Sequence, residues 1–209
     1  MNLHPSIMTL AVVALVNTTA AADLAASFSG QPVCCAKEPT ASKPLTDRSL
    51  YQLNSSWTND AGTELKLAAL RGRPQIVTMF FANCEYACPI LVHDMKRIEA
   101  ALPEHLRANV GFVLVSFDGD RDTPAALAQY RKNHGLAANW TLLRGAPDDV
   151  LELGLLLGVK FKKDLRGQFA HSNVITLLDA KGEIVFQQKG LNCATDQIVA
   201  ALEKSQRNP

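Results

Sequence analysis

Apolar residues along this chain follow two patterns that predict alternating strands and helices. The runs 75–81 (QIVTMFF) and 110–117 (VGFVLVSF) are continuously apolar and β-branched, as expected for strands buried on both faces. A shorter run, 140–143 (WTLL), predicts a third strand. Apolar residues at helical spacing predict three helices, over 89–101, 124–134 and 147–157.

Turn residues predict paired strands at the two ends of this region. Residues 51–67 predict an N-terminal β-hairpin, because 59–62 (NDAG) supply a turn. Near the other end, 173–188 (NVITLLDAKGEIVFQQ) predicts two strands around an Asp-Ala-Lys-Gly turn, and a helix is expected from about Thr195. The whole pattern predicts an α/β fold with a mostly parallel sheet covered by helices on both faces.

The first residues have the pattern of an export signal. Residues 7–16 (IMTLAVVALV) form an apolar core, and small residues at 18–22 offer cleavage sites of the A-x-A kind. The stretch is too short for a membrane span, which needs ~20 apolar residues. No Lys or Arg precedes Lys37, so the usual basic flank is missing. We predict an export signal over 1–22, with an uncleaved anchor or a disordered tail as alternatives.

Export would place the protein in the periplasm or on the outer face of the inner membrane. Residues 23–49, rich in Pro, Ser, Thr and Ala, predict a flexible linker, and the folded domain is expected over 50–205. The five cysteines are an odd number, which differs from the pattern of a small disulfide-stapled domain. A net charge of +1 over 209 residues gives no electrostatic reason to expect a nucleic-acid partner. We expect a monomer.

The candidate chemistry lies in the stretch 80–91 (FFANCEYACPIL). Cys84 and Cys88 follow a predicted buried strand, where α/β folds gather their chemistry, and Pro89 favours the first turn of a helix. The dipole and free N–H groups of that helix start favour a thiolate over a thiol. A redox dithiol, half of a metal site and a buried thiol pair are all open. The spacing fits a metal at least as well as a redox pair, since thioredoxin-type dithiols have two intervening residues.

A third metal ligand is predicted at His171, just before the strand expected from 173. The alternatives are poorer: His93 points about 140° away from Cys88 around the helix, and Met95 is expected in the core. A lone histidine before a strand is otherwise a structural residue. Two thiolates and one imidazole are a soft ligand set that suits Cu(I) and can also hold Cu(II) or Zn(II). Three protein ligands leave one position open, which favours transfer to a partner.

The segments 84–89 (CEYACP) and 169–172 (FAHS) resemble the Sco/SenC family of copper-binding, thioredoxin-like proteins. The resemblance extends over 51–202. It implies a thioredoxin-like fold, in which a central mixed sheet is flanked by helices, and a copper site made by Cys84, Cys88 and His171. It also implies delivery of copper to the CuA centre of cytochrome c oxidase. The partner would be the apo-oxidase subunit that carries CuA, or another copper protein.

Two residues depart from the family pattern. Glu85 stands where the family often has a proline, and its charge disfavours a thiolate at Cys84. Ala170 stands where an aspartate commonly precedes the histidine, so one residue that could orient the imidazole is absent. Neither change removes a ligand.

Four further candidates are weaker. Asp122 is expected to cap the helix at 124–134, with Thr123 as the alternative cap, whereas Asp118 could orient a ligand or a partner. Cys193 is expected to be a packed, unreactive thiol. The adjacent pair Cys34-Cys35 could fetch copper or link to a partner, or have no role in the folded domain.

An enzyme remains an alternative to a metal carrier. A thiol-disulfide oxidoreductase would use Cys84 as the attacking thiolate and Cys88 as the resolving cysteine, and some family members act as such reductants. Thioredoxin-like reductants resemble one another in placing a cis-proline opposite the dithiol. No proline occurs between Pro147 and Pro209, which argues against this as the sole role. A peroxidase and a purely structural module are less favoured.

Overall fold

The structure is a computed structural model that describes residues 44–207. The predicted export signal and the Cys34-Cys35 pair lie outside the described residues. Within 44–207, no helix combines the length and the apolarity that a membrane crossing requires. Leu45, inside the segment expected to be a linker, packs against the core.

Seven of the nine described strands form one sheet, and the other two form a separate hairpin. The elements are, in chain order, η1 (Leu50–Gln52), β1 (Trp57–Asn59), β2 (Glu64–Leu65), η2 (Leu67–Leu70), β3 (Gln75–Phe80), α1 (Ala87–Ala101), α2 (Glu104–Arg107), β4 (Gly111–Ser116), α3 (Pro124–His134), β5 (Trp140–Gly145), α4 (Pro147–Leu156), β6 (Phe161–Lys163), β7 (Phe169–His171), β8 (Val174–Leu178), β9 (Ile184–Lys189) and α5 (Thr195–Arg207).

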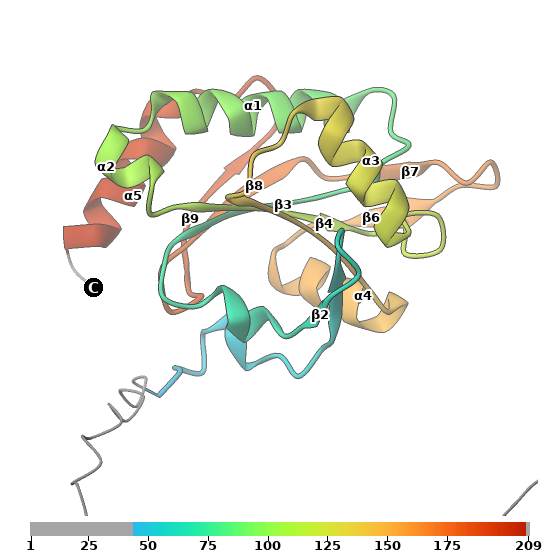
Figure 1. The fold of residues 1–209 in the computed structure, drawn as a ribbon, viewed down its shortest axis with the longest axis horizontal. Coiled ribbons are helices and arrows are strands. Elements are labelled where there is room, and N and C mark those ends of the chain that lie inside the picture. Colours follow the sequence, from blue (N-terminus) through green and yellow to red (C-terminus); the bar gives the residue numbers. More distant parts are fainter. Residues whose placement is uncertain (1–43, 208–209) are drawn as a thin grey trace, which may run out of the picture. The chain divides into compact units, whose positions relative to one another are not determined.

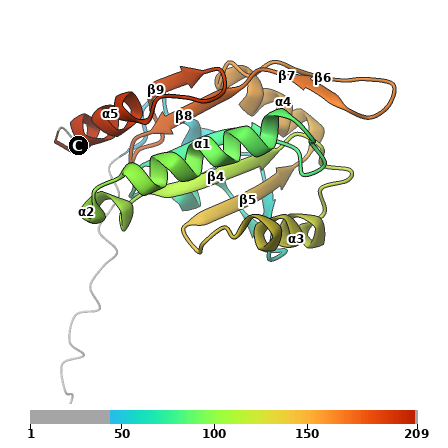
Figure 2. The same ribbon diagram turned by 90° about the horizontal axis from the view of Figure 1, so that it is seen from above.

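The sheet is mixed, in the order β2-β1-β5-β4-β3-β8-β9. Neighbouring strands pair in parallel only at the centre, where β4 lies between β5 and β3. All other neighbours in this sheet pair antiparallel. The mixed thioredoxin-like sheet is therefore confirmed, and the mostly parallel arrangement holds for its centre alone. Helices α1, α3 and α5 cover one face and α4 covers the other (Figures 1 and 2).

Local sequence explains where these elements begin and end. Every residue of β3, β4 and β8 is buried, in agreement with their continuous apolar runs. Helix α3 begins after Thr123, whose hydroxyl accepts the N–H of Ala126, and has Pro124 at its first turn. It ends at Gly135, whose φ of 56° gives the left-handed C-cap that glycine adopts without strain.

The predicted N-terminal hairpin is present but shorter than expected. Its turn holds because the side-chain oxygen of Asn59 accepts the N–H groups of Ala61 and Thr63. Tyr51 lies outside it, in η1, because the side chain of Ser49 accepts its N–H and starts a 3-10 turn. The hairpin of β6 and β7 was not predicted at all. Each of its strands has three residues, too few to show an alternation of apolar and polar positions.

The position of β8 decides where the candidate ligands meet. It pairs antiparallel with β3, with Thr78 opposite Ile175 and Gln75 opposite Leu178. The N-terminal end of β8 therefore lies beside the C-terminal end of β3. The segment that leads into β8 and the loop that leaves β3 meet at the same edge of the sheet, where the β6–β7 hairpin projects (Figure 2).

We expect Leu177→Ala to lower the free energy of unfolding by about 3 kcal/mol, because it opens a cavity in the strand that pairs with β3. Leu177 is fully buried, whereas Val185 on the adjacent β9 is 41% exposed. Val185→Ala is the matched control and should cost well under about 1 kcal/mol. Urea denaturation measures both; equal effects would mean that β8 is not part of the core.

Candidate metal centre

The two cysteines occupy the junction between β3 and α1. Cys84 is half-buried in the loop, and Cys88 is the second residue of α1 and only 1% exposed. The N–H of Cys88 donates to the sulfur of Cys84 over 3.4 Å. Tyr86, at the N-cap, makes no capping hydrogen bond with its side chain. The sulfur of Cys84 therefore accepts one of the N–H groups that a helix start leaves unpaired.

His171 comes to the same place from the β6–β7 hairpin. Its Nε2 lies 3.6 Å from the sulfur of Cys88, and the ligand atoms of Cys84, Cys88 and His171 all lie within 4.8 Å of one another. Its Nδ1 lies 3.2 Å from the carbonyl oxygen of Ser172. A carbonyl only accepts, so Nδ1 carries the proton and the lone pair of Nε2 faces the sulfur atoms.

This convergence fits a single ion with little movement. In a trigonal site with bonds of ~2.0–2.3 Å, the donor atoms lie roughly 3.5–4 Å apart. Cys88 and His171 already have such a separation, and Cys84 needs to approach by at most about 1 Å. The structure thus brings together the three residues that the sequence singled out. His93 is exposed on α1 and Met95 is buried in the core, as expected.

Electrostatics differ from the sequence-based expectation at Cys88. Burial raises the pKa of the Cys88 thiol well above its usual range, and neighbouring Cys84 and Asp122 add to that rise. The helix start does not outweigh this desolvation, so the prediction of a thiolate there is wrong for Cys88 in the metal-free protein. Burial also lowers the pKa of His171, which keeps the imidazole neutral near pH 7. A neutral imidazole is the form that binds a metal.

The site has a closed apolar side and an open side. The rings of Phe117 and Phe81 lie 5.1 Å and 6.3 Å from the ring of His171, and Phe169 packs against both phenylalanines. On the other side, Cys84 and His171 line a cavity of about 590 Å³ between the cysteine loop and the hairpin tip. Cys88 does not line it. A partner can therefore reach Cys84 and His171 from the cavity.

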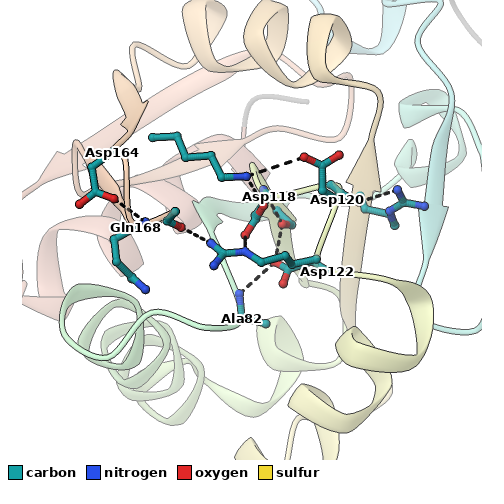
Figure 3. A network of polar contacts seen from close by, with 12 residues as sticks. Ala82, Asp118, Asp120, Asp122, Asp164 and Gln168 are labelled. Carbon is teal, nitrogen blue, oxygen red and sulfur yellow. Dashed lines mark hydrogen bonds and ion pairs between the residues drawn. The ribbon is translucent and has the colours of Figure 1, made fainter.

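The loop after β4 fixes the cysteine segment (Figure 3). Oδ2 of Asp122 accepts the N–H of Ala82 over 2.9 Å and the hydroxyl of Ser116 over 2.5 Å. Asp122 was predicted to cap α3, and that prediction is wrong, because Thr123 is the cap. Asp122 instead holds the chain two residues before Cys84.

The same loop holds the histidine hairpin. The buried carboxylate of Asp118 forms ion pairs with Arg121 and with Lys163 of β6, the latter over 3.3 Å. Arg121 also donates to the carbonyl oxygen of Gly167 at the hairpin tip. The sequence analysis left open that Asp118 orients a ligand or a partner, and in the structure its carboxylate pairs with the hairpin that carries His171. Sequence reasoning missed Arg121, for which the charged run 118–122 (DGDRD) was the sole signal, and it also missed Lys163.

Cys193 lies apart from this site. It is a free, buried thiol before α5, where its N–H donates to the carboxylate of Asp94. The expectation of a packed thiol agrees with this position.

Comparisons with known proteins agree with this arrangement. The profile of the SCO1/SenC family matches residues 45–206. The chain belongs to the SCO1/SenC family. It is 24% identical over 155 residues to a SCO1 protein homolog of Bacillus subtilis, covering 72% of this chain and 80% of that one. It is 28% identical over 142 residues to a putative copper-binding protein of Stutzerimonas stutzeri, covering 66% of this chain and 68% of that one.

Solved structures, two of them of proteins named as Sco, share the fold of this SCO1/SenC chain. A putative electron transfer protein of Aquifex aeolicus aligns with a TM-score of 0.68 at 20% identity, over 77% of this chain and 94% of that one. Yeast Sco1 with copper bound aligns with a TM-score of 0.63 at 22% identity, over 74% and 87%. BsSco, a Sco protein with a disulfide switch, aligns with a TM-score of 0.63 at 24% identity, over 74% and 92%.

We expect Arg121→Ala to loosen the hairpin and leave the cysteine helix in place, because Arg121 joins Asp118 to Gly167. Hydrogen exchange of the amides of β6 and β7 should speed up by about tenfold or more, with α1 unchanged. Arg166→Ala is the control, since Arg166 is exposed at the same tip and its side chain forms a weak 3.9 Å ion pair with Asp164. The hydrogen bond from its backbone N–H to Asp164 is kept in the variant. An equal increase in the exchange rate of the α1 amides would contradict an effect confined to the hairpin.

Acid should destabilise the fold through His171. The pKa of this histidine is lowered by burial from its ordinary value of 6.5, so the unfolded chain takes up the proton first. Its contribution to stability is present above pH 6.5 and is lost as the pH falls through the lowered pKa. Between about pH 7.5 and pH 5, wild type should therefore lose more unfolding free energy than His171→Gln. Denaturant titrations at each pH measure the free energy of unfolding. Equal losses in wild type and His171→Gln would mean that the imidazole of His171 is solvated in the folded protein.

Proposed function

We propose that this SCO1/SenC chain binds copper through Cys84, Cys88 and His171 and delivers it to the CuA centre of cytochrome c oxidase. The observation that carries the proposal is the convergence of two sulfur atoms and an unprotonated imidazole nitrogen within 4.8 Å. Soft sulfur ligands with one imidazole favour copper among the common metal ions. Relatives support this, since copper-bound structures exist for Sco1 of yeast and a related protein is named as copper-binding.

The recipient is proposed from the family. BsSco is described as a member of the Sco family of cytochrome c oxidase assembly proteins. We therefore assign the apo-oxidase subunit that carries CuA as the partner, with another copper protein as the alternative. The predicted export signal would place the exchange in the periplasm or at the outer face of the inner membrane.

The asymmetry of the site gives an order of events. Binding of copper displaces the thiol proton of Cys88, which the high pKa of that group otherwise retains. Cys84 and His171 face the cavity, so an incoming thiolate approaches the ion from their side. Ligands then exchange stepwise, and the buried Cys88 is the last to release the ion. Oxidation of the two cysteines would remove both thiolates and end binding.

A second candidate function is thiol-disulfide exchange, which the unequal burial of the two cysteines favours. Cys84 is reachable from the cavity and can attack a partner disulfide, while Cys88 is positioned to resolve it. Thioredoxin-like reductants resemble one another in a cis-proline opposite the dithiol, whereas here His171 lies beside the dithiol and no proline occurs between Pro147 and Pro209. We therefore assign exchange as the secondary role.

One experiment separates the two functions. His171→Ala should lower Cu(I) affinity by about tenfold or more and keep measurable exchange, because it removes a metal ligand and neither sulfur atom. Cys84→Ser should lose both activities. Competition with a chromogenic Cu(I) chelator measures affinity, and reduction of a model disulfide measures exchange.

His93→Ala is the matched control, because His93 is exposed on α1 five residues after Cys88. It should behave as wild type in both assays. Unchanged copper affinity in His171→Ala would contradict a copper site with three protein ligands. Transfer from the loaded protein to a purified apo-CuA domain tests the recipient separately.

A further inference from the structure

The β6–β7 hairpin has an unpaired edge on each side, because its two strands pair with each other and with no other described strand. The N–H groups of Asp164 and Ser172 donate across the hairpin, over 2.7 Å and 2.8 Å. In an antiparallel pair, hydrogen-bonded positions alternate with positions whose N–H and C=O groups point away from the partner strand. The backbone groups of Phe169 and His171 therefore point outward from β7, where no other described residue hydrogen-bonds to them.

The cavity beside Cys84 lies along this outer edge of β7. Its hairpin wall includes residues of β7 and none of β6. Gln168 and Phe169 both line it, and consecutive residues of an extended chain direct their side chains to opposite faces. A cavity that both residues line is at the edge of the strand, and not over one of its faces. The facing wall is the cysteine segment 84–87, so the outward groups of β7 face the candidate metal centre.

The cavity has the size for an added strand. Its volume is about 590 Å³, within the range of ~300–1,000 Å³ that ligand pockets have. A strand paired with β7 would lie ~4.8 Å from it, between the hairpin and the cysteine segment. Two large apolar side chains flank the opening: Tyr86 on the cysteine segment is 81% exposed, and Leu165 at the hairpin tip is fully exposed. Exposed apolar side chains grouped around an opening are typical of an interaction site.

We propose that an extended segment of the recipient protein, with a cysteine in it, binds in this cavity as a third strand of the hairpin. Its main chain pairs with the N–H and C=O groups of Phe169 and His171, and its cysteine sulfur lies beside Cys84, where the ion has its open position. Strand addition takes affinity from main-chain hydrogen bonds and specificity from alternate side chains. The identity of the recipient rests on the proposed function, whereas the pairing with β7 is testable without copper.

A disulfide-forming reaction at Cys84 measures the approach of such a segment. The full-length chain with Cys34→Ser, Cys35→Ser and Cys88→Ser keeps Cys84 as its accessible thiol, since Cys193 is buried. The probe is a short synthetic peptide whose central cysteine is joined to thionitrobenzoate. The thiolate of Cys84 attacks the peptide sulfur, the existing S–S bond breaks, and its electron pair leaves on the coloured thionitrobenzoate. The absorbance of that product gives the second-order rate constant.

Two N-methylated forms of the peptide test the main-chain pairing. Successive N–H groups of a strand point to opposite sides, so one form has methyl groups on the amides that face β7 and the other has them on the intervening amides. We expect one form to react about tenfold more slowly than the unmodified peptide, the effect of losing its hydrogen bonds to β7, and the other to react at the unmodified rate. Equal rates for the two methylated peptides would overturn the proposal.

Hydrogen exchange in the trapped disulfide locates the added strand. The amides of Phe169 and His171 should exchange about tenfold more slowly than in the free chain, because they now donate to the peptide. The amides of Phe161 and Lys163 are the matched control, since they point outward from β6, which does not line the cavity. Equal slowing at both edges, or none at either, would contradict pairing with β7.

Tyr86→Ala should slow the reaction of the unmodified peptide severalfold, because this side chain borders the cavity. Leu155→Ala is the control, since Leu155 is 72% exposed on α4, which covers the other face of the sheet (Figure 1). An unchanged rate in Tyr86→Ala, or an equal loss in Leu155→Ala, would contradict docking at this cavity.

The failures of the two proposals are distinguishable. If wild type binds no copper and the two methylated peptides still react at different rates, the copper-carrier function is refuted and the strand addition stands. If wild type binds copper and the two methylated peptides react alike, the metal centre stands and the strand addition is refuted.

Discussion

The antiparallel pairing of β3 with β8 is the constraint on which the site depends. Cys88 and His171 are 83 positions apart along the chain, and their side chains lie 3.6 Å apart. The pairing places the end of β3 beside the start of β8, so that a loop leaving one strand meets a hairpin entering the other. Both strands are buried along their whole length, which fixes this register through the core.

Strand pairing alone brings the cysteine loop and the histidine hairpin to one edge of the sheet, and it does not fix the positions of their side chains. These positions are fixed by the loop after β4, which contacts both segments. Asp122 holds Ala82 on the cysteine side, and Asp118 with Arg121 holds the hairpin on the histidine side. The loop thus orients the two cysteines and the histidine, and it contributes no candidate ligand itself. Such outer partners tune a metal site by restricting the positions of its ligands.

The sequence predicted those parts of the protein that depend on periodicity. Buried strands such as 75–81 and the helix at 124–134 have repeating apolar patterns, and the three candidate ligands were found because cysteine and histidine are chemically distinctive. The β6–β7 hairpin could not be found, since three-residue strands carry no period. The roles of Asp122 and Arg121 could not be found either, because the contacts that tie them to the site are with backbone groups, at Ala82 and Gly167. Every residue has such backbone groups, so no residue type in the sequence marks these contacts.

Ala170, where the family commonly has an aspartate, shows how a backbone group can orient a ligand. The family resemblance implied that one residue that could orient the imidazole is absent at this position. The structure instead directs Nδ1 of His171 to the carbonyl oxygen of Ser172. Every residue carries such a carbonyl, so this tautomer does not depend on the side chain at position 170. Ala170 is exposed, and an aspartate there would add charge at the surface. The imidazole is therefore oriented by the turn into β8, and hence by the pairing that positions the whole site.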